Sequence, residues 1–386
     1  MDKITIQHPA LIATATAIAT TSLIVFARLT LWPRRRQVLK SPLKTVIPRI
    51  PEEERRGLVY LPDAFPGARD VDTPYGTIRA YEFGPLHGQK VLLVHGISTS
   101  CITLSRIAHE LVDRGCRVML FDLFGRGFTD GVGDIPHDTR LYTTQMLLVL
   151  ASSPLCWTGT NAFRLIGYSL GGGIVVPFAN AFPHMVSSLV LLAPSGLINA
   201  ASFGAVSRFV FSSGFVPERV LAVLTGRRLQ RPIAPSKAAA AAARSKAAVV
   251  MAAAEVGNLN EDQGQGKVAS LEERVLDYVR WMVLNHEGFV PAFMSCVRHA
   301  PLMEQHEQWR GLAKRQPGTT AMIFAEADEL INVKEYEEQG LLLAGGKDHV
   351  FWRVVPGNHD FVMTHVAAIM ALLDEFWGTG GEGRGV

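Results

Sequence analysis

Hydrophobic and polar positions along the chain predict a sheet whose strands alternate with helices from about residue 76 onward. Short apolar runs rich in β-branched residues recur there, and helical patterns lie between several of them. The strand candidates are GTIRAYEF, VLLVHGI, CRVMLFDL, AFRLIGYS, SLVLLAPS, TAMIFAEAD and VFWRVVPG. Alternation of this kind is typical of a mostly parallel sheet with helices on both faces. The pattern therefore predicts the α/β class.

The strand pattern stops between residues 197 and 316. This stretch contains only helical runs, such as RVLAVLTGRRL, SKAAAAAARSKAAVVMAAAEV and LEERVLDYVRWMVLNH. Strands resume at Thr319. An insertion of this size within an α/β domain predicts a helical cap at 197–316, between two parts of the core at 76–196 and 317–377. The apolar segment 203–224 of this cap could pack onto the core or line an acyl-binding tunnel.

The first thirty residues differ in composition from the rest of the chain. An uncharged run extends from Pro9 to Phe26, and Trp32 and three arginines follow it. Crossing a bilayer takes about 20 mainly apolar residues, and an interfacial aromatic followed by positive charges is typical of the end of a span. We therefore expect residues 1–33 to form a single-pass membrane anchor, with a cleaved signal peptide and a mitochondrial presequence as open alternatives.

Charges beside this run predict its orientation. Five basic residues follow it with no acidic residue among them, whereas Lys3 and Asp2 balance each other before it. Because positive flanks stay on the cytosolic side, we expect the folded domain to lie on the cytosolic face of a membrane. Residues 34–75 are predicted to be a proline-rich basic linker, and residues 378–386 a flexible tail.

Composition argues against two classes of partner. Residues 28–49 contain seven basic residues, and subtracting these from the 38 in the chain leaves 31 against 35 acidic residues. The basicity is thus local, and we expect no nucleic-acid partner. The cysteines are scattered, without a C-x-x-C pair or a histidine cluster at ligand spacing, so we expect reduced thiols and no metal site. These cysteines are Cys101, Cys116, Cys156 and Cys296.

The stretch LIGYSLGGGI places Ser169 between Gly167 and Gly171, where a predicted strand ends and a predicted helix begins. A sharp strand-to-helix turn strains its middle residue and projects that side chain out of the sheet. Side chains two positions before and after would collide with neighbouring backbone, so both must be very small. The turn also aims free N–H groups of the helix N-terminus at whatever Ser169 attacks. The motif therefore predicts a nucleophilic serine.

A reactive serine needs a base, and the base needs an orienting carboxylate. His359, in VVPGNHDFV, follows the last predicted strand, from where an imidazole can reach over the sheet edge. Asp328, in MIFAEADEL, ends the preceding strand, and Glu326 and Glu329 are rival acids. The order serine, acid, histidine is typical of α/β folds with a nucleophilic turn.

Two other strand ends carry residues that we expect to shape loops. His95 and Gly96 follow the second predicted strand, and Asp122 follows the third. The backbone N–H after Gly96, that of Ile97, would face the serine across the sheet. Together with the N–H of Leu170 it would form an oxyanion hole with two donors.

These segments together resemble the α/β-hydrolase superfamily, in particular its capped lipases, esterases and peptidase-like members. HGI, DLFGRG, GYSLGG, AEAD and GNHDF occur in the family's order between about Gly76 and Trp377. The resemblance implies the α/β-hydrolase fold, with a mostly parallel sheet of the eight-stranded type, helices on both faces and an inserted cap. Carried over residue by residue, it places the nucleophile on Ser169, the acid on Asp328 and the base on His359.

The resemblance implies a membrane-anchored serine hydrolase that cleaves ester bonds, or thioester or amide bonds, of lipid-like or other apolar substrates without a cofactor. The anchor and cap are similar to membrane-bound monoacylglycerol lipase-like hydrolases, which implies the endoplasmic reticulum or a lipid-droplet surface. Two alternatives stay open. One is a C–C bond hydrolase or a tailoring esterase of a specialised metabolite, and the other is a catalytically inactive scaffold with this fold.

Overall fold

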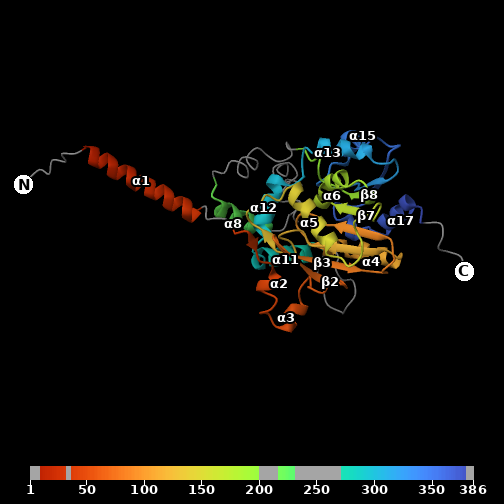
Figure 1. Cartoon of the computed structure of the whole chain (residues 1–386), viewed down its shortest axis with the longest axis horizontal. Helices are drawn as coiled ribbons and strands as arrows, with labels where there is room; N and C mark the ends of the chain where they lie inside the picture. Colours follow the sequence, from red (N-terminus) through yellow and green to blue (C-terminus); the bar gives the residue numbers. More distant parts are fainter. Residues whose placement is uncertain (1–8, 32–35, 200–215, 231–270, 380–386) are drawn as a thin grey trace, which may run out of the picture.

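The computed structural model describes residues 9–31, 36–199, 216–230 and 271–379 (Figure 1). Its centre is an eight-stranded sheet in the order β10-β9-β8-β7-β4-β5-β3-β2. The strands from β10 to β5 pair in parallel, while β3 and β2 add two antiparallel pairings at one edge. The strands are β2 (Ala68–Thr73), β3 (Gly76–Phe83), β4 (Lys90–Val94), β5 (Arg117–Phe121), β7 (Phe163–Tyr168), β8 (Val186–Leu192), β9 (Thr320–Ala325) and β10 (Val350–Val355). The predicted α/β fold with a mostly parallel sheet is confirmed.

Two groups of helices cover the sheet. Helix α4 packs with α17, whereas α6 packs with α5 and α13. Their bounds are α4 (Ser105–Asp113), α5 (Thr139–Ala151), α6 (Leu170–Ala181), α13 (His306–Gly311) and α17 (Val366–Trp377). The chain progresses from β4 to β5 on one side and then returns to β7 on the other side of β4. Right-handed crossovers running in these opposite directions place α4 and α6 on opposite faces, and the reversal opens a crevice beyond the ends of β4 and β7.

The central strands are buried because helices cover both of their faces. Every residue of β9 is buried, and β4 and β7 each have a single residue that is not. In the sequence, strands that are buried on both faces form continuous apolar runs. VLLV and TAMIFA are therefore identifiable as strands from the sequence.

The predicted cap is described in part. Helices α8 (Glu218–Leu229), α11 (Leu271–Asn285) and α12 (Phe289–His299) pack against one another. Residues 200–215 and 231–270 lie outside the described part of the chain, and with them most of the apolar segment 203–224 and the alanine-rich run. The limits of the cap therefore stay a prediction.

A linker is predicted at residues 34–75. In the structure, residues 36–75 form short elements that are attached to the folded domain. Strand β1 (Val38–Leu39) pairs with β6 (Gly131–Val132), and the short helices α2 (Pro42–Thr45) and α3 (Glu52–Arg56) follow. The Lys44 Nζ lies 2.6 Å from a carboxylate oxygen of the buried Asp130. The segment is thus fastened to the domain by backbone pairing and by an ion pair.

The structure of the N-terminal segment contradicts the prediction of a membrane anchor. Helix α1 (Pro9–Leu31) extends away from the rest of the chain in Figure 1. Within the described residues, no helix combines the length and the apolar composition needed to cross a membrane. Threonines and a serine dilute the apolar run, namely Thr14, Thr16, Thr20, Thr21 and Ser22. The prediction of a single-pass anchor at residues 1–33 was therefore wrong, and so was the localisation derived from it; residues 1–8 and 32–35 lie outside the described part.

Candidate active site

The turn between β7 and α6 holds Ser169 in a left-handed conformation. Its φ is 54° and its ψ is −119°, values that a non-glycine residue rarely adopts. A Cβ on Gly167 would lie 2.5 Å from the Gly171 carbonyl oxygen, and one on Gly171 would lie 2.1 Å from the Val94 carbonyl oxygen. The backbone packing leaves no room for a side chain at either glycine, which is the steric demand that the sequence motif indicated.

The structure brings the predicted nucleophile, base and acid together. The His359 Nε2 lies 3.0 Å from the Ser169 Oγ, and its Nδ1 lies 2.8 Å from the Asp328 Oδ2. Ser169 and His359 are fully buried, as is the Asp328 carboxylate. Of the rival acids, Glu326 is exposed, and Glu329 accepts a hydrogen bond from the His359 backbone N–H at 3.2 Å. The imidazole therefore contacts Asp328.

The Asp328 carboxylate is oriented by the loop that carries it. Its Oδ1 accepts hydrogen bonds from the backbone N–H groups of Leu330 at 2.9 Å and Ile331 at 2.7 Å. These bonds leave Oδ2 directed at the His359 Nδ1. The loop therefore fixes the orientation of the carboxylate towards the imidazole.

The predicted oxyanion donors lie on two segments that are packed closely together. A Cβ on Gly171 would meet the carbonyl oxygens of both Val94 and His95, so the first turn of α6 is pressed against the end of β4. Leu170 opens α6, and the first N–H groups of a helix have no partner within the helix. Ile97 is fully buried, two residues beyond His95. The oxyanion hole itself stays a prediction.

His95 is bound to backbone at both ring nitrogens. Its Nδ1 donates to the Gly96 carbonyl at 2.9 Å, and its Nε2 accepts from the Leu123 N–H at 2.9 Å. Burial, together with the nearby positive Arg126, lowers the pKa of His95 to about 3. The ring is therefore neutral and links the loops after β4 and β5, in line with the loop-shaping role expected for it.

Asp122 links three segments. Its carboxylate accepts hydrogen bonds from the backbone N–H groups of Cys101 and Phe128 and from the Tyr60 hydroxyl, at 2.9 to 3.0 Å. Burial raises its pKa, while these donors lower it. Tyr60 was not singled out from the sequence, because its partner is 62 positions away and no local motif marks the pair.

Arg126 is a second residue that sequence reasoning missed. It is fully buried, and its Nε donates to the Ile97 carbonyl. Another of its nitrogens donates to the Gly125 carbonyl at 3.2 Å, and its guanidinium lies over the Phe289 ring. The arginine of DLFGRG therefore anchors the loop that carries the predicted oxyanion donor, and its place between two turn glycines was the available signal.

No cluster of three or more histidine, cysteine, aspartate or glutamate side chains suited to a metal ion occurs in the described part of the chain. All four cysteines are free thiols, and Cys156 alone of the four is exposed.

Comparison with known proteins finds similarity over part of the chain. A family model described as serine aminopeptidase, S33, matches residues 87–256. An uncharacterized protein of Mycobacterium tuberculosis is 28% identical over 145 residues, 38% of this chain and 40% of that protein. A serine hydrolase-like protein of Dictyostelium discoideum is 30% identical over 146 residues, 35% of this chain and 38% of that protein. The chain thus spans about two fifths of the length of these curated relatives.

The fold has counterparts among solved structures. A bromoperoxidase from Bacillus anthracis superposes with a TM-score of 0.56 at 16% identity, covering 81% of this chain and 99% of that one. At that identity the likeness concerns the fold alone.

Proposed function

This chain belongs to the α/β-hydrolase superfamily, and on that premise we propose that it is a serine esterase acting on apolar substrates. Its similarity to serine hydrolase-like proteins supports hydrolase chemistry. The observation that carries the finer proposal is the hydrogen-bonded series of Ser169, His359 and Asp328, with contacts of 3.0 and 2.8 Å. A catalytically inactive scaffold would not need to keep these three side chains within hydrogen-bonding distance of one another.

In the first half of the proposed reaction, Asp328 holds the proton on the His359 Nδ1, so the Nε2 lone pair faces the Ser169 hydroxyl. As the Ser169 Oγ attacks the ester carbonyl carbon, its proton moves to Nε2. The carbonyl oxygen becomes negative and is stabilised by the N–H groups of Leu170 and Ile97. The negative Asp328 stabilises the imidazolium that forms.

In the second half, the tetrahedral intermediate breaks its bond to the alcohol oxygen, and His359 gives its Nε2 proton to that leaving group. An acyl group then remains on the Ser169 Oγ. Water attacks this acyl-enzyme while His359 takes a proton from it, and collapse releases the carboxylic acid and restores the serine hydroxyl. Every proton in this cycle passes through the His359 Nε2, and no cofactor is needed.

The test is hydrolysis of p-nitrophenyl esters from acetate to palmitate by the full-length protein. We expect turnover by the wild type and a loss of at least about 10³-fold in kcat/KM for Ser169→Ala. Ser195→Ala is the matched control, because Ser195 is also buried and lies in the loop after the neighbouring strand β8. A wild type that hydrolyses none of these esters, or a Ser169→Ala variant that keeps wild-type turnover, would contradict the proposal.

A further inference from the structure

Helix α8 presents a group of apolar side chains to solvent. Val220, Val223 and Leu224 are 45%, 53% and 54% exposed. Residues three and four positions apart are neighbours on a helix surface, so these side chains form one continuous stripe, the α8 stripe. Single exposed apolar residues are normal on a folded protein, whereas a contiguous group indicates an interaction surface. The α8 stripe is therefore a candidate for contact with a partner.

The opposite face of α8 is fixed against the rest of the cap, so the stripe cannot turn inwards. Leu221 and Leu229 on that face are buried, and α8 packs on both α11 and α12. At the start of α8, the Glu218 carboxylate accepts two hydrogen bonds from the Arg298 guanidinium of α12, at 2.9 and 3.1 Å. The packing and this ion pair hold the stripe on the outer side of the cap.

Positive charges flank the stripe at both ends. Arg219 and Arg227 are exposed, and neither forms an ion pair within the residues that the structure describes. They are eight positions apart, which is about 12 Å along a helix. No exposed position of α8 carries an acidic residue. The outer face of α8 therefore combines an apolar centre with positive ends.

Further basic residues reach the same end of the cap. A Cβ on Gly226 would lie 3.4 Å from a methyl of Val283 and 3.7 Å from a methyl of Val290, so the C-terminal end of α8 lies against the turn between α11 and α12. Glu287 in that turn binds the Arg36 guanidinium at 2.8 Å. Figure 1 shows α8 at the end of the domain from which α1 extends. The basic segment after α1 thus adds positive charge close to α8.

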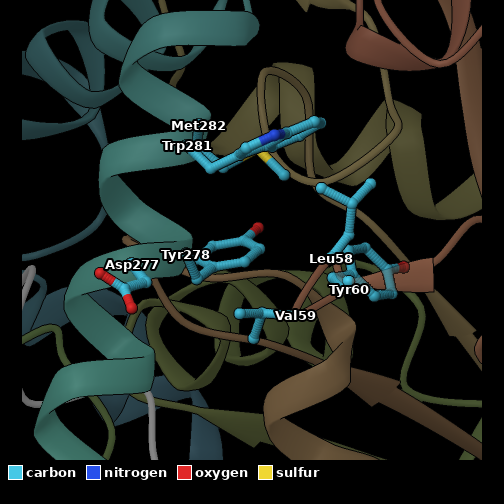
Figure 2. A pocket seen from close by; sticks show the side chains of 8 residues that line it. Leu58, Val59, Tyr60, Asp277, Tyr278, Trp281 and Met282 are labelled. Carbon is cyan, nitrogen blue, oxygen red and sulfur yellow. The ribbon is translucent and has the colours of Figure 1, made fainter. Parts of the chain in front are cut away.

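Another apolar feature of the cap lies between two parts of the chain itself. A cavity of about 180 Å³ separates the segment that precedes the sheet from α11 (Figure 2). Trp281 and Tyr278 lie on opposite sides of the open space in Figure 2, with Leu58 at its edge. No residue of α8 lines this cavity. Both of its walls belong to this chain, so the cavity offers no outward face to a partner, whereas the α8 stripe does.

The size and composition of the α8 surface fit a lipid surface better than a protein. A standard protein interface uses about 20–30 residues on each side and is enriched in aromatic residues. The α8 stripe and its two flanking arginines amount to five residues, none of them aromatic. Attachment to a lipid surface needs no matching face. Its strength grows with the apolar area inserted and with the attraction of basic residues to anionic headgroups.

We propose that α8 docks peripherally onto an anionic lipid surface. Val220, Val223 and Leu224 enter the headgroup region, and the arginines at the two ends of the stripe contact the acidic headgroups. This contact needs no membrane-spanning segment. It is also independent of the proposed esterase function, so each proposal can fail without the other.

A fluorescent probe on α8 tests the contact in the full-length protein. Cys156→Ser removes the exposed thiol, and the other three cysteines are buried, so Val223→Cys in this background gives one accessible site for a nitrobenzoxadiazole label. With vesicles of an equimolar mixture of phosphatidylcholine and phosphatidylserine, we expect the emission to shift to shorter wavelength and to gain intensity. Vesicles of phosphatidylcholine alone should give a smaller change. No change with the mixed vesicles would overturn the inference.

The matched control carries the same label at position 342. Leu342 in α15 (Leu341–Leu343) is 72% exposed, and Glu337 and Glu338 precede it. A probe there should remain in water with either kind of vesicle. Equal changes at positions 223 and 342 would indicate non-specific adsorption. A change at position 223 that needs no vesicles and grows with protein concentration would indicate that the stripe binds a second copy of the chain. Either result would overturn the inference.

Sedimentation of the unlabelled full-length protein with the mixed vesicles measures what each part of the surface contributes. Val223→Asp combined with Leu224→Asp should weaken binding at least about tenfold, because two apolar side chains can no longer insert. Arg219→Gln and Arg227→Gln should each weaken it about fivefold, and added NaCl should weaken the wild type more than these variants. Leu342→Asp is the control and should bind like the wild type. Wild-type binding by the double aspartate variant would overturn the inference.

Discussion

The Tyr168 hydroxyl donates a hydrogen bond to the backbone carbonyl of His359 at 2.9 Å, and the two rings lie with centroids 5.2 Å apart. The residue before the proposed nucleophile therefore holds the loop that carries the proposed base. Tyr168→Phe keeps the ring and removes this bond. We expect kcat for ester hydrolysis to fall about three- to tenfold, with KM and the melting temperature little changed, because the role inferred for Tyr168 is to position His359. An unchanged kcat would show that the bond has no positioning role.

The acid of the proposed triad can be separated from its rivals by amide substitutions. Asp328→Asn should lower kcat by about 10³-fold or more, because an amide cannot hold the imidazole in the tautomer that accepts the serine proton. Glu326→Gln is the control, since Glu326 is exposed and close in sequence, and it should leave kcat unchanged. Steady-state kinetics of both variants decide the matter; full activity in Asp328→Asn with an inactive Glu326→Gln would reverse the assignment.

The nucleophile turn should not tolerate a methyl group at Gly171. A new Cβ would lie 2.1 Å from the Val94 carbonyl oxygen, so the turn and the end of β4 would have to move apart. We expect Gly171→Ala to destabilise the protein by about 3 kcal/mol and to lose activity. Gly159→Ala is matched, because a Cβ there meets no atom within 4 Å. Urea unfolding of the two variants measures the difference, and equal free energies of unfolding would refute the steric account.

Buried neutral histidines should make the protein sensitive to acid. Burial, assisted by the positive Arg126, lowers the pKa of His95 and of His137 to about 3, and burial lowers that of His286 to about 4. In the unfolded chain these pKa values return to about 6.5. The unfolded state therefore binds more protons below pH 6.5, and stability is lost as the pH falls from there towards the folded values.

The loss should be of the order of 2 kcal/mol for each of these histidines between pH 6.5 and pH 5. His137 offers the cleanest test, because neither of its ring nitrogens has a hydrogen-bond partner in the described residues. His137→Leu should reduce the fall in unfolding free energy between pH 7 and pH 5 by about that amount. The same fall in the variant and the wild type would show that His137 titrates normally.

The parts of this molecule that could be read from the sequence are those set by local pattern. A helix-covered strand such as β9 leaves a continuous apolar run, and the crowding of Gly167 and Gly171 around Ser169 leaves a short motif. Contacts between residues that are far apart in the sequence produce no local sequence pattern. The bonds of Tyr168 to His359 and of Arg126 to Ile97 depend on which loops meet, which is decided by the strand order.

Two segments show where local reading was insufficient. Residues 36–75 have the prolines and charges of a linker, yet Lys44 finds a buried partner in Asp130, 86 positions away. The length of the apolar run before them predicts a membrane span, but its interspersed threonines leave the helix without the apolar composition that a span requires.

The central claim is that Ser169 is a nucleophile activated by His359. The most direct measurement is labelling of the full-length protein with a fluorophosphonate, followed by peptide mass spectrometry to locate the adduct. We predict a single adduct on Ser169 in the wild type and in Ser195→Ala, none in Ser169→Ala, and labelling slowed by at least about 10³-fold in His359→Ala. An adduct on another residue, or labelling of Ser169→Ala at the wild-type rate, would contradict the account.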